Sequence, residues 1–504
     1  MSHILAVDLG SSYLKCALYT RALRLVAHRA EPIELHVSGP QVENDPEDWW
    51  RAMCRCIPLI LEEAGLLATD VSAMSFCAQM QSVVLVDADL RAVRRSIGYL
   101  DTRATEVFGE HMQHGWPRVA GLDAKKVLPS VYLSNIGPGS PKDAIWKLRW
   151  LQKHEPDTFA RAYRWLDAKD YLVARCTGKA VTTADSAHLS CLYTFDGQAS
   201  RYSPLLCRIY GVDPSLLPEV VPGNEGLGGL LPTAAQDLGL APGTPIFPGG
   251  GDISCVALGT GATQEGDTHI YLGTSAWVAQ TTRRRKLDIA HFMATVRTCL
   301  PDDYLYLGEL ETAGVCLSWA ARCFAEPGAQ PLEPGALEAE AGRSPPGARG
   351  LVFTPWLHGS RSPNEDPFAR GAFMNLGLTH QRSDMLRAVY EGVALHLGWI
   401  LEALSAKLPV SGSLRFVGGG AHSALWSKIL ADVTGKRIEA LEEPQLCGTR
   451  GAAFLAAGRA EPIRTPVKTF DPNAANRKLY QDRLALLQRV YQTNRPLFPG
   501  MPRG

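Results

Sequence analysis

The chain has 504 residues, and its 51 Lys and Arg residues balance its 51 Asp and Glu residues. This length exceeds what one hydrophobic core usually spans, which predicts two domains. The balanced charge excludes a nucleic-acid footprint, no apolar run is long enough to cross a bilayer, and the first residues lack the features of a signal peptide. We therefore expect a cytoplasmic protein without nucleic-acid or membrane partners. The 12 cysteines fit no zinc pattern and are expected to be reduced and mostly buried.

The first half of the chain predicts strands that alternate with helices. Its expected elements are a buried strand at 3–9 with a hairpin partner at 14–20, a helix at 46–65, two strands within 73–87 and an amphipathic helix at 142–155.

The second half continues this alternation, which predicts an α/β fold. Its expected elements are a strand, glycine loop and helix within 240–262, two strands within 266–282, an exposed connection in part of 326–350, a helix at 382–405, and a strand, glycine loop and helix within 414–435. A last helix at 479–494 is expected to pack on the body of the protein or on a partner.

A strand followed by glycine and hydroxyl residues occurs twice, as AVDLGSS at 6–12 and YLGTS at 271–275. Two matching hairpins, one early in each half, predict two related domains that face each other. We place the N-terminal domain at 1–248, with the first hairpin. The C-terminal domain at 249–504 then holds the aspartate loop, the second hairpin and the helical tail.

The first hairpin has the residue types of a phosphate site. Gly10, Ser11 and Ser12 offer backbone N–H groups and hydroxyls that suit phosphate oxygens. Asp8 would repel phosphate, so its place is explained by a Mg²⁺ ion held through water. Lys15 adds positive charge, although a solvated hairpin lysine is equally plausible. An ordinary hairpin turn is the simpler interpretation of this motif taken alone.

Two further glycine loops are candidate ligand sites. In GGGD at 249–252, the glycines would let a ligand approach Asp252, which would accept a proton from an attacking hydroxyl. The alternative role for Asp252 is a helix N-cap. GGGAH at 418–422 would let a nucleotide base or ribose lie against bare backbone, or else it is a tight turn between a strand and a helix.

The order of these loops along the chain is that of the superfamily of actin, hexokinase and the heat-shock chaperones. Within it, the sequence resembles the FGGY carbohydrate kinases, and most closely their xylulokinase branch, to about residue 460. The matching stretches are DLGSSYLK (8–15), AQMQSVVLVD (78–87), YLDTR (99–103), WKLRWLQKHEPD (146–157), DAKDYLVARCTGKAVTTADSAHLSCLYTFD (167–196), GSRSPNEDPFARGAFMNLGLTH (359–380), AVYEGVAL (388–395), VGGGAHSALWSKILADVTG (417–435) and GTRGAAFLAA (448–457).

This resemblance implies two actin-like ATPase domains, of the ribonuclease H-like kind, around a central cleft. It also implies a kinase that uses ATP and Mg²⁺, with Asp252 as catalytic base and Asp8 in the magnesium shell. The phosphates would be held by Gly10, Ser11, Ser12, Lys15, Gly273 and Thr274, and adenosine by Gly418, Gly419, Gly420 and Ser423. The sugar would be faced by Met80, Gln81, Asp252, Asp101 and Arg103. A homodimer is left open.

The departures from the family pattern lie on the sugar side. Gln81 replaces an expected histidine, Ile253 replaces an Asn or Gln after the catalytic aspartate, and Asn375 replaces a glycine. Ile253 removes a hydrogen-bonding group, and such groups discriminate strongly between substrates. The expected reaction converts D-xylulose to D-xylulose 5-phosphate. Another ketose, a polyol or a sugar acid such as gluconate stays open as substrate, although Asp101 would repel a carboxylate.

Two rival functions also follow from the sequence. A catalytically weak sugar sensor would explain the changes at Gln81 and Ile253, but an intact Asp252 argues against it. An ATPase that acts like the chaperone and filament relatives is disfavoured by the sugar-kinase stretches at 146–157 and 359–395. The expectation remains an active sugar kinase.

Overall fold

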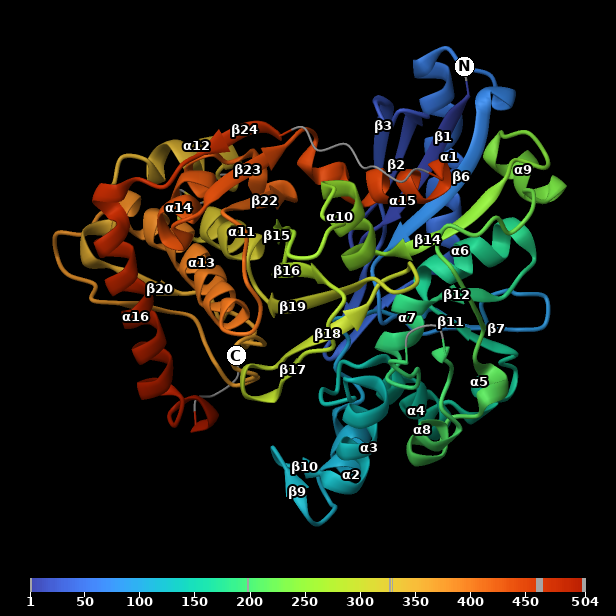
Figure 1. The fold of residues 1–504 in the computed structure, drawn as a ribbon, viewed down its shortest axis with the longest axis horizontal. Coiled ribbons are helices and arrows are strands. Elements are labelled where there is room, and N and C mark those ends of the chain that lie inside the picture. The colour runs from blue at the N-terminus through green and yellow to red at the C-terminus, as the bar shows by residue number, and fades with distance from the viewer. Residues whose placement is uncertain (1, 197–198, 326–327, 329, 459–465, 501–504) are drawn as a thin grey trace. The chain divides into compact units, whose positions relative to one another are not determined.

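A computed structural model of the chain describes residues 2–196, 199–325, 328, 330–458 and 466–500 (Figure 1). The chain divides into two compact units. Unit 1 comprises Met1–Gly261, Val296–Leu305 and Leu446–Ile463, and unit 2 comprises Ala262–Thr295, Tyr306–Gln445 and Arg464–Gly504. Each unit is built around its own β-sheet, and the two are described in turn.

The sheet of unit 1 has five strands in the order β14-β6-β1-β2-β3 (Figure 1). The strands are β1 (His3–Leu9), β2 (Tyr13–Thr20), β3 (Leu25–Pro32), β6 (Val71–Ala78) and β14 (Ile246–Gly251). β1 pairs antiparallel with β2, as the predicted hairpin requires, and parallel with β6, which in turn pairs parallel with β14. Three neighbouring strands therefore end at the same edge of the sheet.

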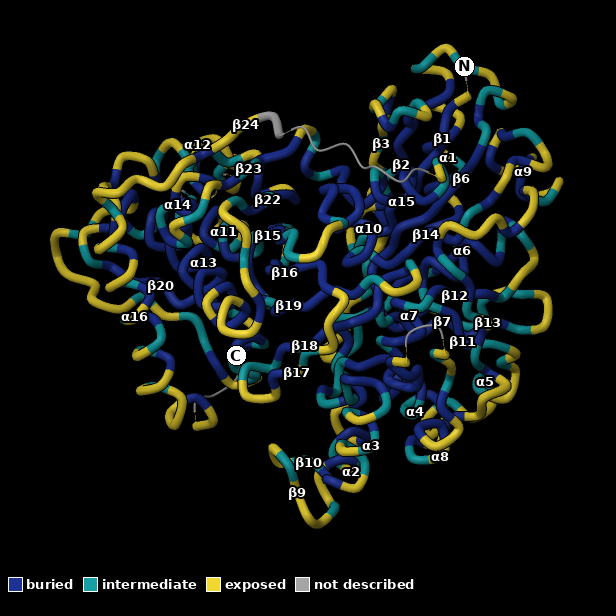
Figure 2. Tube along the Cα trace, viewed as in Figure 1, coloured by how far each residue is buried: buried dark blue, intermediate teal, exposed yellow. Residues whose placement is uncertain are grey.

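Helices cover both faces of this sheet, because β1 buries apolar side chains on each side. Leu5 and Val7 share a hydrophobic cluster with residues of α1 (Pro46–Ala64) and α6 (Ala168–Thr177). Ile4 and Ala6, which alternate with them, pack in a second cluster with α10 (Asp252–Thr260) and α15 (Cys447–Ala457). The strands are accordingly buried along most of their length (Figure 2).

The rest of unit 1 consists of short elements. Its small sheets pair β4 (His36–Ser38), β5 (Gln41–Asn44) and β8 (Ser96–Ile97); β7 (Val84–Val86) and β11 (Arg164–Leu166); β9 (Arg118–Val119) and β10 (Leu122–Asp123); and β12 (Val181–Thr183) and β13 (Glu219–Val221). Its other helices are α2 (Thr105–Met112), α3 (Ala124–Ser134), α4 (Ala144–His154), α5 (Pro156–Ala160), α7 (Ala184–Leu189), α8 (Pro204–Tyr210) and α9 (Pro232–Leu238). The predicted helix at 142–155 is confirmed as α4.

The sheet that runs through unit 2 has eight strands in the order β17-β18-β19-β16-β15-β22-β23-β24. They are β15 (Thr268–Leu272), β16 (Ala276–Thr282), β17 (Leu287–Asp288), β18 (Met293–Arg297), β19 (Tyr304–Leu310), β22 (Ser413–Val417), β23 (Arg437–Leu441) and β24 (Pro466–Phe470). β15 pairs antiparallel with β16 and parallel with β22, which repeats the arrangement of β1, β2 and β6. The predicted relationship between the two hairpins is thus visible in the topology.

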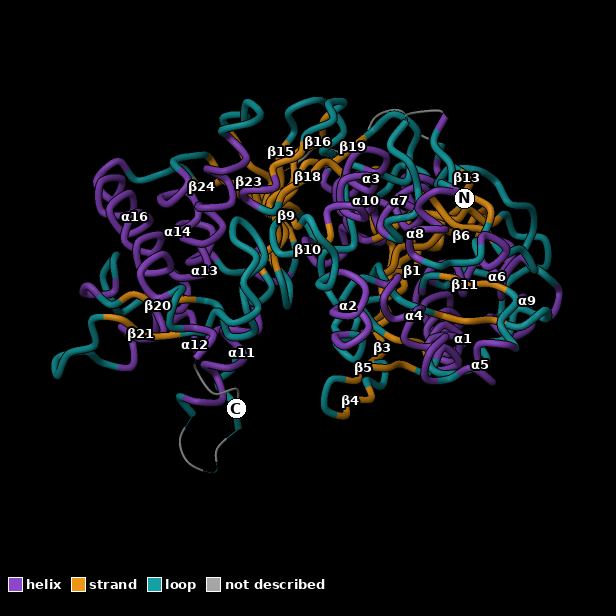
Figure 3. Tube along the Cα trace, turned by 90° about the horizontal axis from the view of Figure 1, so that it is seen from below, coloured by secondary structure: helices purple, strands orange, loops and turns teal. Residues whose placement is uncertain are grey.

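The core of unit 2 forms around α13 (Arg382–Ser405), which has the bounds that the sequence predicts. Beside it lie α11 (Gly314–Cys323), α14 (Ala424–Thr434) and α16 (Arg477–Asn494), with α13, α14 and α16 side by side in Figure 3. Tyr480 and Leu487 of α16 are buried in the same cluster as α13, so the tail helix packs on its own unit. A short pair of strands, β20 (Val352–Thr354) and β21 (Ala372–Met374), completes the unit.

Some predictions need adjustment. The predicted connection within 326–350 contains α12 (Pro334–Ala341), whose Leu337 and Ala341 are buried. The predicted domain boundary, between residues 248 and 249, lies inside β14. Since β14 pairs with β6, the structure places Asp252 in unit 1, whereas the prediction put it in the C-terminal domain.

The cysteines agree with the expectation of mostly buried side chains, because all but Cys54 and Cys323 are buried. Within the described part of the chain, no helix combines the length and apolar character needed to cross a membrane.

Candidate active site

The carboxyl ends of β1, β6 and β14 bring four predicted residues to one edge of the unit 1 sheet. Asp8 lies near the end of β1, Met80 and Gln81 follow β6, and Asp252 follows β14. The backbone N–H of Gln79 donates to the carbonyl of Leu9 at 2.8 Å, which ties two of these strand ends together. Ligands of open α/β sheets bind at this edge, so the arrangement suits a substrate site.

Asp8 is a nearly buried carboxylate with a lysine beside it. It stands opposite Lys15 across the hairpin, and its Oδ2 atom lies 3.5 Å from the Lys15 Nζ atom. A Cβ atom at Gly448 would come within 2.8 Å of the same oxygen, so α15 packs closely against this carboxylate. The side chain of Asp8 keeps 12% of its surface exposed, enough to meet a hydrated cation.

The turn after Asp8 leaves its hydroxyl groups accessible. The N–H of Gly10 donates to the carbonyl of Tyr13 at 2.9 Å and closes the turn. Ser11 is partly exposed and Ser12 is exposed, as residues that hold phosphate need to be.

The glycines before Asp252 serve packing more than ligand access. A Cβ atom on Gly249, whose φ is +75°, would lie 1.7 Å from the carbonyl oxygen of Phe76. One on Gly251 would lie 2.3 Å from the Met80 sulfur. The GGG run thus lets β14 approach β6 and lets Met80 lie under the loop, which corrects the expectation that it clears space for a ligand.

Asp252 is the first residue of α10 and is half-buried, while Gly251 holds the N-cap position. The Asp252 Oδ1 atom accepts a hydrogen bond from the N–H of Ile253 at 2.8 Å. A helix N-terminus stabilises a negative charge, which keeps a carboxylate ionised and able to accept a proton. The alternative prediction, that Asp252 is the N-cap, does not fit the structure.

Gln81 sits in a strained turn that the partly buried Asp167 and the buried Lys147 hold in place. Its φ is +64°, unusual for a residue with a side chain. The carboxylate of Asp167 accepts the N–H groups of Gln81 and Ser82 at 3.2 and 3.0 Å. Burial, and then the charge of Asp170, raises the pKa of Asp167 to about 7.

Lys147, fully buried on α4, holds the other side of this turn. Its Nζ atom donates to the carbonyls of Gly98, Gln81 and Tyr99 at 2.8, 3.3 and 3.3 Å. Burial lowers the pKa of Lys147 to about 7. Sequence reasoning missed Lys147 and Asp167, although a lysine among the apolar residues of 146–151 was a signal that could have been followed.

Asp101 and Arg103 are buried and paired with each other in unit 1. The Asp101 side chain has 0% exposure and Arg103 has 3%. Asp101 accepts the N–H of Val42 at 2.6 Å and is paired with the Arg103 guanidinium at 2.8 Å. Arg103 also pairs with Glu43 at 2.8 Å and lies over the ring of Trp150. These contacts use both charges within the protein, which argues against the predicted direct contact with sugar.

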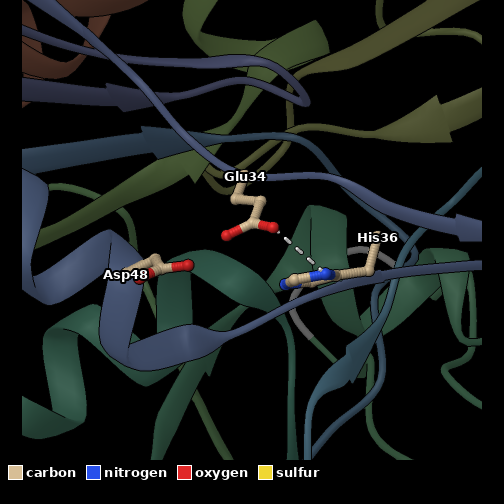
Figure 4. A group of neighbouring side chains, drawn as sticks. All are labelled: Glu34, His36 and Asp48. Atoms are coloured by element: carbon tan, nitrogen blue, oxygen red, sulfur yellow. Dashed lines mark ion pairs between the residues drawn. The ribbon is translucent and has the colours of Figure 1, made fainter.

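Two other features of unit 1 give no substrate site. A cavity of about 30 Å³ lies against Gln81, Asp167 and Ser186, which is room for about two water molecules and not for a sugar. Among the described residues, one group could offer three metal ligands, and Figure 4 shows it to consist of Glu34, His36 and Asp48. It is a surface group of the kind that is common without a metal, and we assign it no role.

In unit 2, the turn between β15 and β16 carries Gly273 and Thr274. The carbonyls of this turn accept hydrogen bonds from the first residues of α11, with Gly314 N at 2.9 Å from Gly273 O. Thr274 is exposed and Gly273 partly so. The turn is therefore held from behind by a helix while its outer side stays accessible to phosphate oxygens.

The glycine loop after β22 lies beside this turn, because β22 is parallel to β15. Gly418 has a φ of +87°, and a Cβ atom on it would lie 2.5 Å from the Leu272 carbonyl oxygen. A Cβ atom on Gly420 would also touch Leu272, whereas one on Gly419 would meet nothing within 4 Å. Gly419 is thus the one of the three whose surface is open to a flat ligand.

Ser423 has a role in the fold that the sequence did not predict. It is the N-cap of α14, and its Oγ atom accepts the N–H of Trp426 at 3.0 Å. It is only partly buried, so this cap leaves some of its surface accessible beside the glycine loop.

Comparison with known proteins agrees with these features. The model of the FGGY family of carbohydrate kinases matches residues 3–259 with its N-terminal domain and 269–460 with its C-terminal domain. The xylulose kinase of Bacillus subtilis (strain 168) is 28% identical over 517 residues, covering 99% of this chain and 98% of the relative.

Two solved structures share the fold over almost the full length. The xylulose kinase of Lactobacillus acidophilus has a TM-score of 0.87 at 23% identity, covering 99% of this chain and 100% of the other. The gluconate kinase of the same organism has a TM-score of 0.86 at 23% identity, covering 99% of each chain. The two units therefore have the actin-like ATPase fold, and the chain belongs to the FGGY family of carbohydrate kinases, enzymes that use ATP.

Proposed function

We propose that this protein transfers the γ-phosphoryl group of ATP to D-xylulose and releases D-xylulose 5-phosphate and ADP. Unit 1 supplies the sugar side and the base, and unit 2 supplies the nucleotide side. The observation that carries this proposal is the position of Asp252 at the head of α10, on the same sheet edge as Asp8, Met80 and Gln81. That edge combines a proton acceptor with a second carboxylate suited to a cation.

In the proposed step, a sugar hydroxyl donates its proton to a carboxylate oxygen of Asp252 as its oxygen attacks the γ-phosphorus. The bond between that phosphorus and the β–γ bridging oxygen breaks, and its electrons stay on ADP. The N–H of Ile253 orients the Asp252 carboxylate through the 2.8 Å hydrogen bond. A positioned base of this kind contributes roughly 10²–10⁴-fold to the rate.

Asp8 is the residue that fits a magnesium ion. A single, slightly exposed carboxylate suits a cation that keeps most of its water ligands. The ion would neutralise phosphate charge. Ser11, Ser12 and Lys15 in unit 1, and Gly273 and Thr274 in unit 2, are proposed to bind phosphate oxygens. Gly418, Gly419 and Gly420, with the nearby Ser423, are proposed to bind adenosine, and the open face of Gly419 supports this.

The choice of sugar rests on the relatives, and the structure weakens the argument against a sugar acid. The xylulose kinase of Bacillus subtilis is similar over nearly the whole chain, which supports D-xylulose. The repulsion expected between Asp101 and a sugar acid loses its basis, because Arg103 neutralises Asp101 inside the protein. Gluconate therefore stays a second candidate, supported by the shared fold of a gluconate kinase.

The test is ADP release from ATP with a panel of ketoses, polyols and sugar acids, in the wild type and in Asp252→Ala. We expect D-xylulose to stimulate the wild type and the variant to lose at least about 10²-fold in kcat. A stronger response to gluconate would replace the substrate and keep the kinase. No response to any sugar, with equal slow hydrolysis in both proteins, would refute the base and favour a sensor or a chaperone-like ATPase.

A further inference from the structure

A buried aspartate that the proposed step does not use lies behind the catalytic loop. Asp185 is the second residue of α7, the helix that follows β12, and it is 2% exposed. An ionised carboxylate at such a depth is costly unless several donors surround it. Its partners therefore show what the fold uses it for.

The four hydrogen bonds to Asp185 divide between its own turn and the head of α10. Its Oδ1 atom accepts from the Thr183 hydroxyl at 2.5 Å and from the N–H of Ser186 at 2.9 Å. Its Oδ2 atom accepts from the N–H of Gly251 at 2.8 Å and from the Ser254 hydroxyl at 2.7 Å. Gly251 and Ser254 flank Asp252 on either side.

Further contacts make this a fixed support. The Ser254 hydroxyl accepts the N–H of Cys299 at 3.2 Å, so Ser254 is engaged on two sides. A Cβ atom on Gly250 would lie 3.2 Å from the Asp185 Oδ2 atom, which shows how tightly the loop rests on the carboxylate. The buried ammonium of Lys169, which donates to Asp170, also interacts with the charge of Asp185.

We propose that Asp185 is a positioning residue that fixes the first turn of α10 and thereby aims the Asp252 carboxylate at the sugar hydroxyl. This inference rests on the proposed role of Asp252 as base. Nothing in the GGGD motif points to Asp185, because the two are far apart in the sequence and meet only in the fold.

Asparagine at this position keeps the size of the side chain and turns one oxygen into an NH₂ group. Both oxygens of the native carboxylate accept hydrogen bonds, so the NH₂ group would point at a hydrogen-bond donor whichever way the amide is turned. Two donors cannot bond to each other, and hydrogen bonds to Asp185 would be lost. The first turn of α10 would then shift, and a displacement of about 1 Å of a catalytic group costs about 10²-fold in rate. Sugar binding by the rest of unit 1 would change little.

The experiment compares Asp185→Asn and Ser254→Ala with Asp384→Asn. Asp384 is a matched control, since it is 1% exposed, accepts the Ser344 hydroxyl at 2.6 Å and lies at the start of α13 in unit 2. We expect Asp185→Asn to lower kcat about 10²-fold and Ser254→Ala about tenfold, with sugar KM within about threefold. Asp384→Asn should leave kcat near the wild-type value, even if it lowers the thermal midpoint as much as Asp185→Asn does.

A double variant separates this inference from the proposed function. In Asp252→Ala, adding Asp185→Asn should cost no further activity, because the group it aims is gone. Hydrogen exchange of the Gly251 amide should also speed up in Asp185→Asn. If Asp252→Ala stays active, the proposed function fails.

Three results would overturn the inference while leaving the base in place. In the first, Asp252→Ala is inactive while Asp185→Asn and Ser254→Ala both keep the wild-type kcat. Another is an equal loss of kcat in the Asp384 control. The third is an additive loss in the double variant. If Asp185→Asn fails to fold, Ser254→Ala alone decides, since it removes one of the four hydrogen bonds to Asp185, together with the bond from the Cys299 N–H, and leaves the carboxylate paired with its other three donors.

Discussion

The two hairpins of this protein have the same topology and different chemistry. In unit 1, the second cross-strand pair from the turn is Asp8 opposite Lys15, a carboxylate beside an ammonium group. In unit 2, the pair at the same place is Tyr271 opposite Trp277, whose rings stack at 3.9 Å with an angle of 13° between their planes. One hairpin therefore presents a charged pair, and the other presents the turn of Gly273 and Thr274 on an aromatic support.

The difference extends to the strands beside each hairpin. Around the unit 1 edge, the buried Lys147 and Asp185 and the partly buried Asp167 hold loops through hydrogen bonds. In the corresponding loops of unit 2, glycines at 418 and 420 pack directly on Leu272. Charged support suits a site that handles a metal and a proton, whereas bare backbone suits a nucleotide. Variants in unit 1 should accordingly change kcat and pH dependence, and variants in unit 2 should change nucleotide affinity.

The largest expected effect comes from removing the charge of the first hairpin. Asp8→Asn keeps the shape and should lower kcat by about 10²–10³-fold, because a preorganised charge at the phosphates is lost. Tyr271→Phe at the matching position should keep the ring stack and most of the activity. Steady-state ADP release over a range of Mg²⁺ concentrations measures both, and equal losses in the two variants would contradict the assigned difference.

The next effect is a pH dependence of stability that comes from Lys147. Burial lowers its pKa from 10.5 to about 7, while Asp101, Asp143 and Asp167 act to raise it and Lys142 to lower it. Between these values the unfolded chain binds a proton that the folded chain lacks. Stability should therefore rise with pH through this window, by up to about tenfold in the unfolding equilibrium per pH unit.

Urea unfolding at several pH values between 7 and 10 measures this rise. Lys147→Met should lack it, since no proton is released there on folding. Asp167 titrates at the lower end of this range and affects stability mainly below it, because the pKa of its folded state is raised to about 7. Parallel curves for the wild type and the variant would show that Lys147 keeps its proton in the fold.

A smaller effect is expected in unit 2 from Gly418→Ala. Alanine at a φ of +87° is strained, and its Cβ atom would press on the Leu272 carbonyl, so we expect a loss of about 1–3 kcal/mol in stability and a higher KM for ATP. Gly419→Ala has open space and should raise the KM for ATP without changing the thermal midpoint. Unchanged ATP affinity in both variants would show that the glycine loop does not bind the nucleotide.

The smallest effect is expected for Lys15→Met. Its side chain is 29% exposed and its Nζ atom is 3.5 Å from Asp8, so the pair should contribute less than about 1 kcal/mol to stability. A modest rise in the KM for ATP, with kcat almost unchanged, is the expected kinetic result. A large fall in kcat would show instead that Lys15 acts on the transferred phosphoryl group.

The regular elements were predictable because their patterns are local. The continuous apolar run that includes Ile4 to Val7 predicts β1, and the apolar repeat at 382–405 predicts α13 to the residue. The glycine loops were also found, since Gly, Ser, Thr and Asp at strand ends are a strong signal. Why glycine is needed at these positions was harder to foresee, because the GGG run before Asp252 packs against Phe76 and Met80, which are distant in the sequence.

The supports of the site could not be predicted, because they join residues that are distant in the sequence. Asp185 and the Gly251 amide are 66 positions apart, and Asp167 and Gln81 are 86 apart. The contacts of Asp101 and Arg103 could not be predicted for a related reason. Their types suit a sugar site, and only the approach of Val42 and Glu43 shows that both charges are used inside the protein.

The division of unit 1 into three stretches of chain has a consequence for how the protein is made. One face of its sheet packs Ile4 against Cys255, Cys299 and Phe454, which come from all three stretches. A ribosome that has released the first 261 residues has therefore delivered the sheet without its α15 cover. Although α10 covers part of that apolar face, the part that α15 covers must stay unburied until the third stretch emerges, and a protein truncated before residue 446 would expose it permanently to chaperones and proteases.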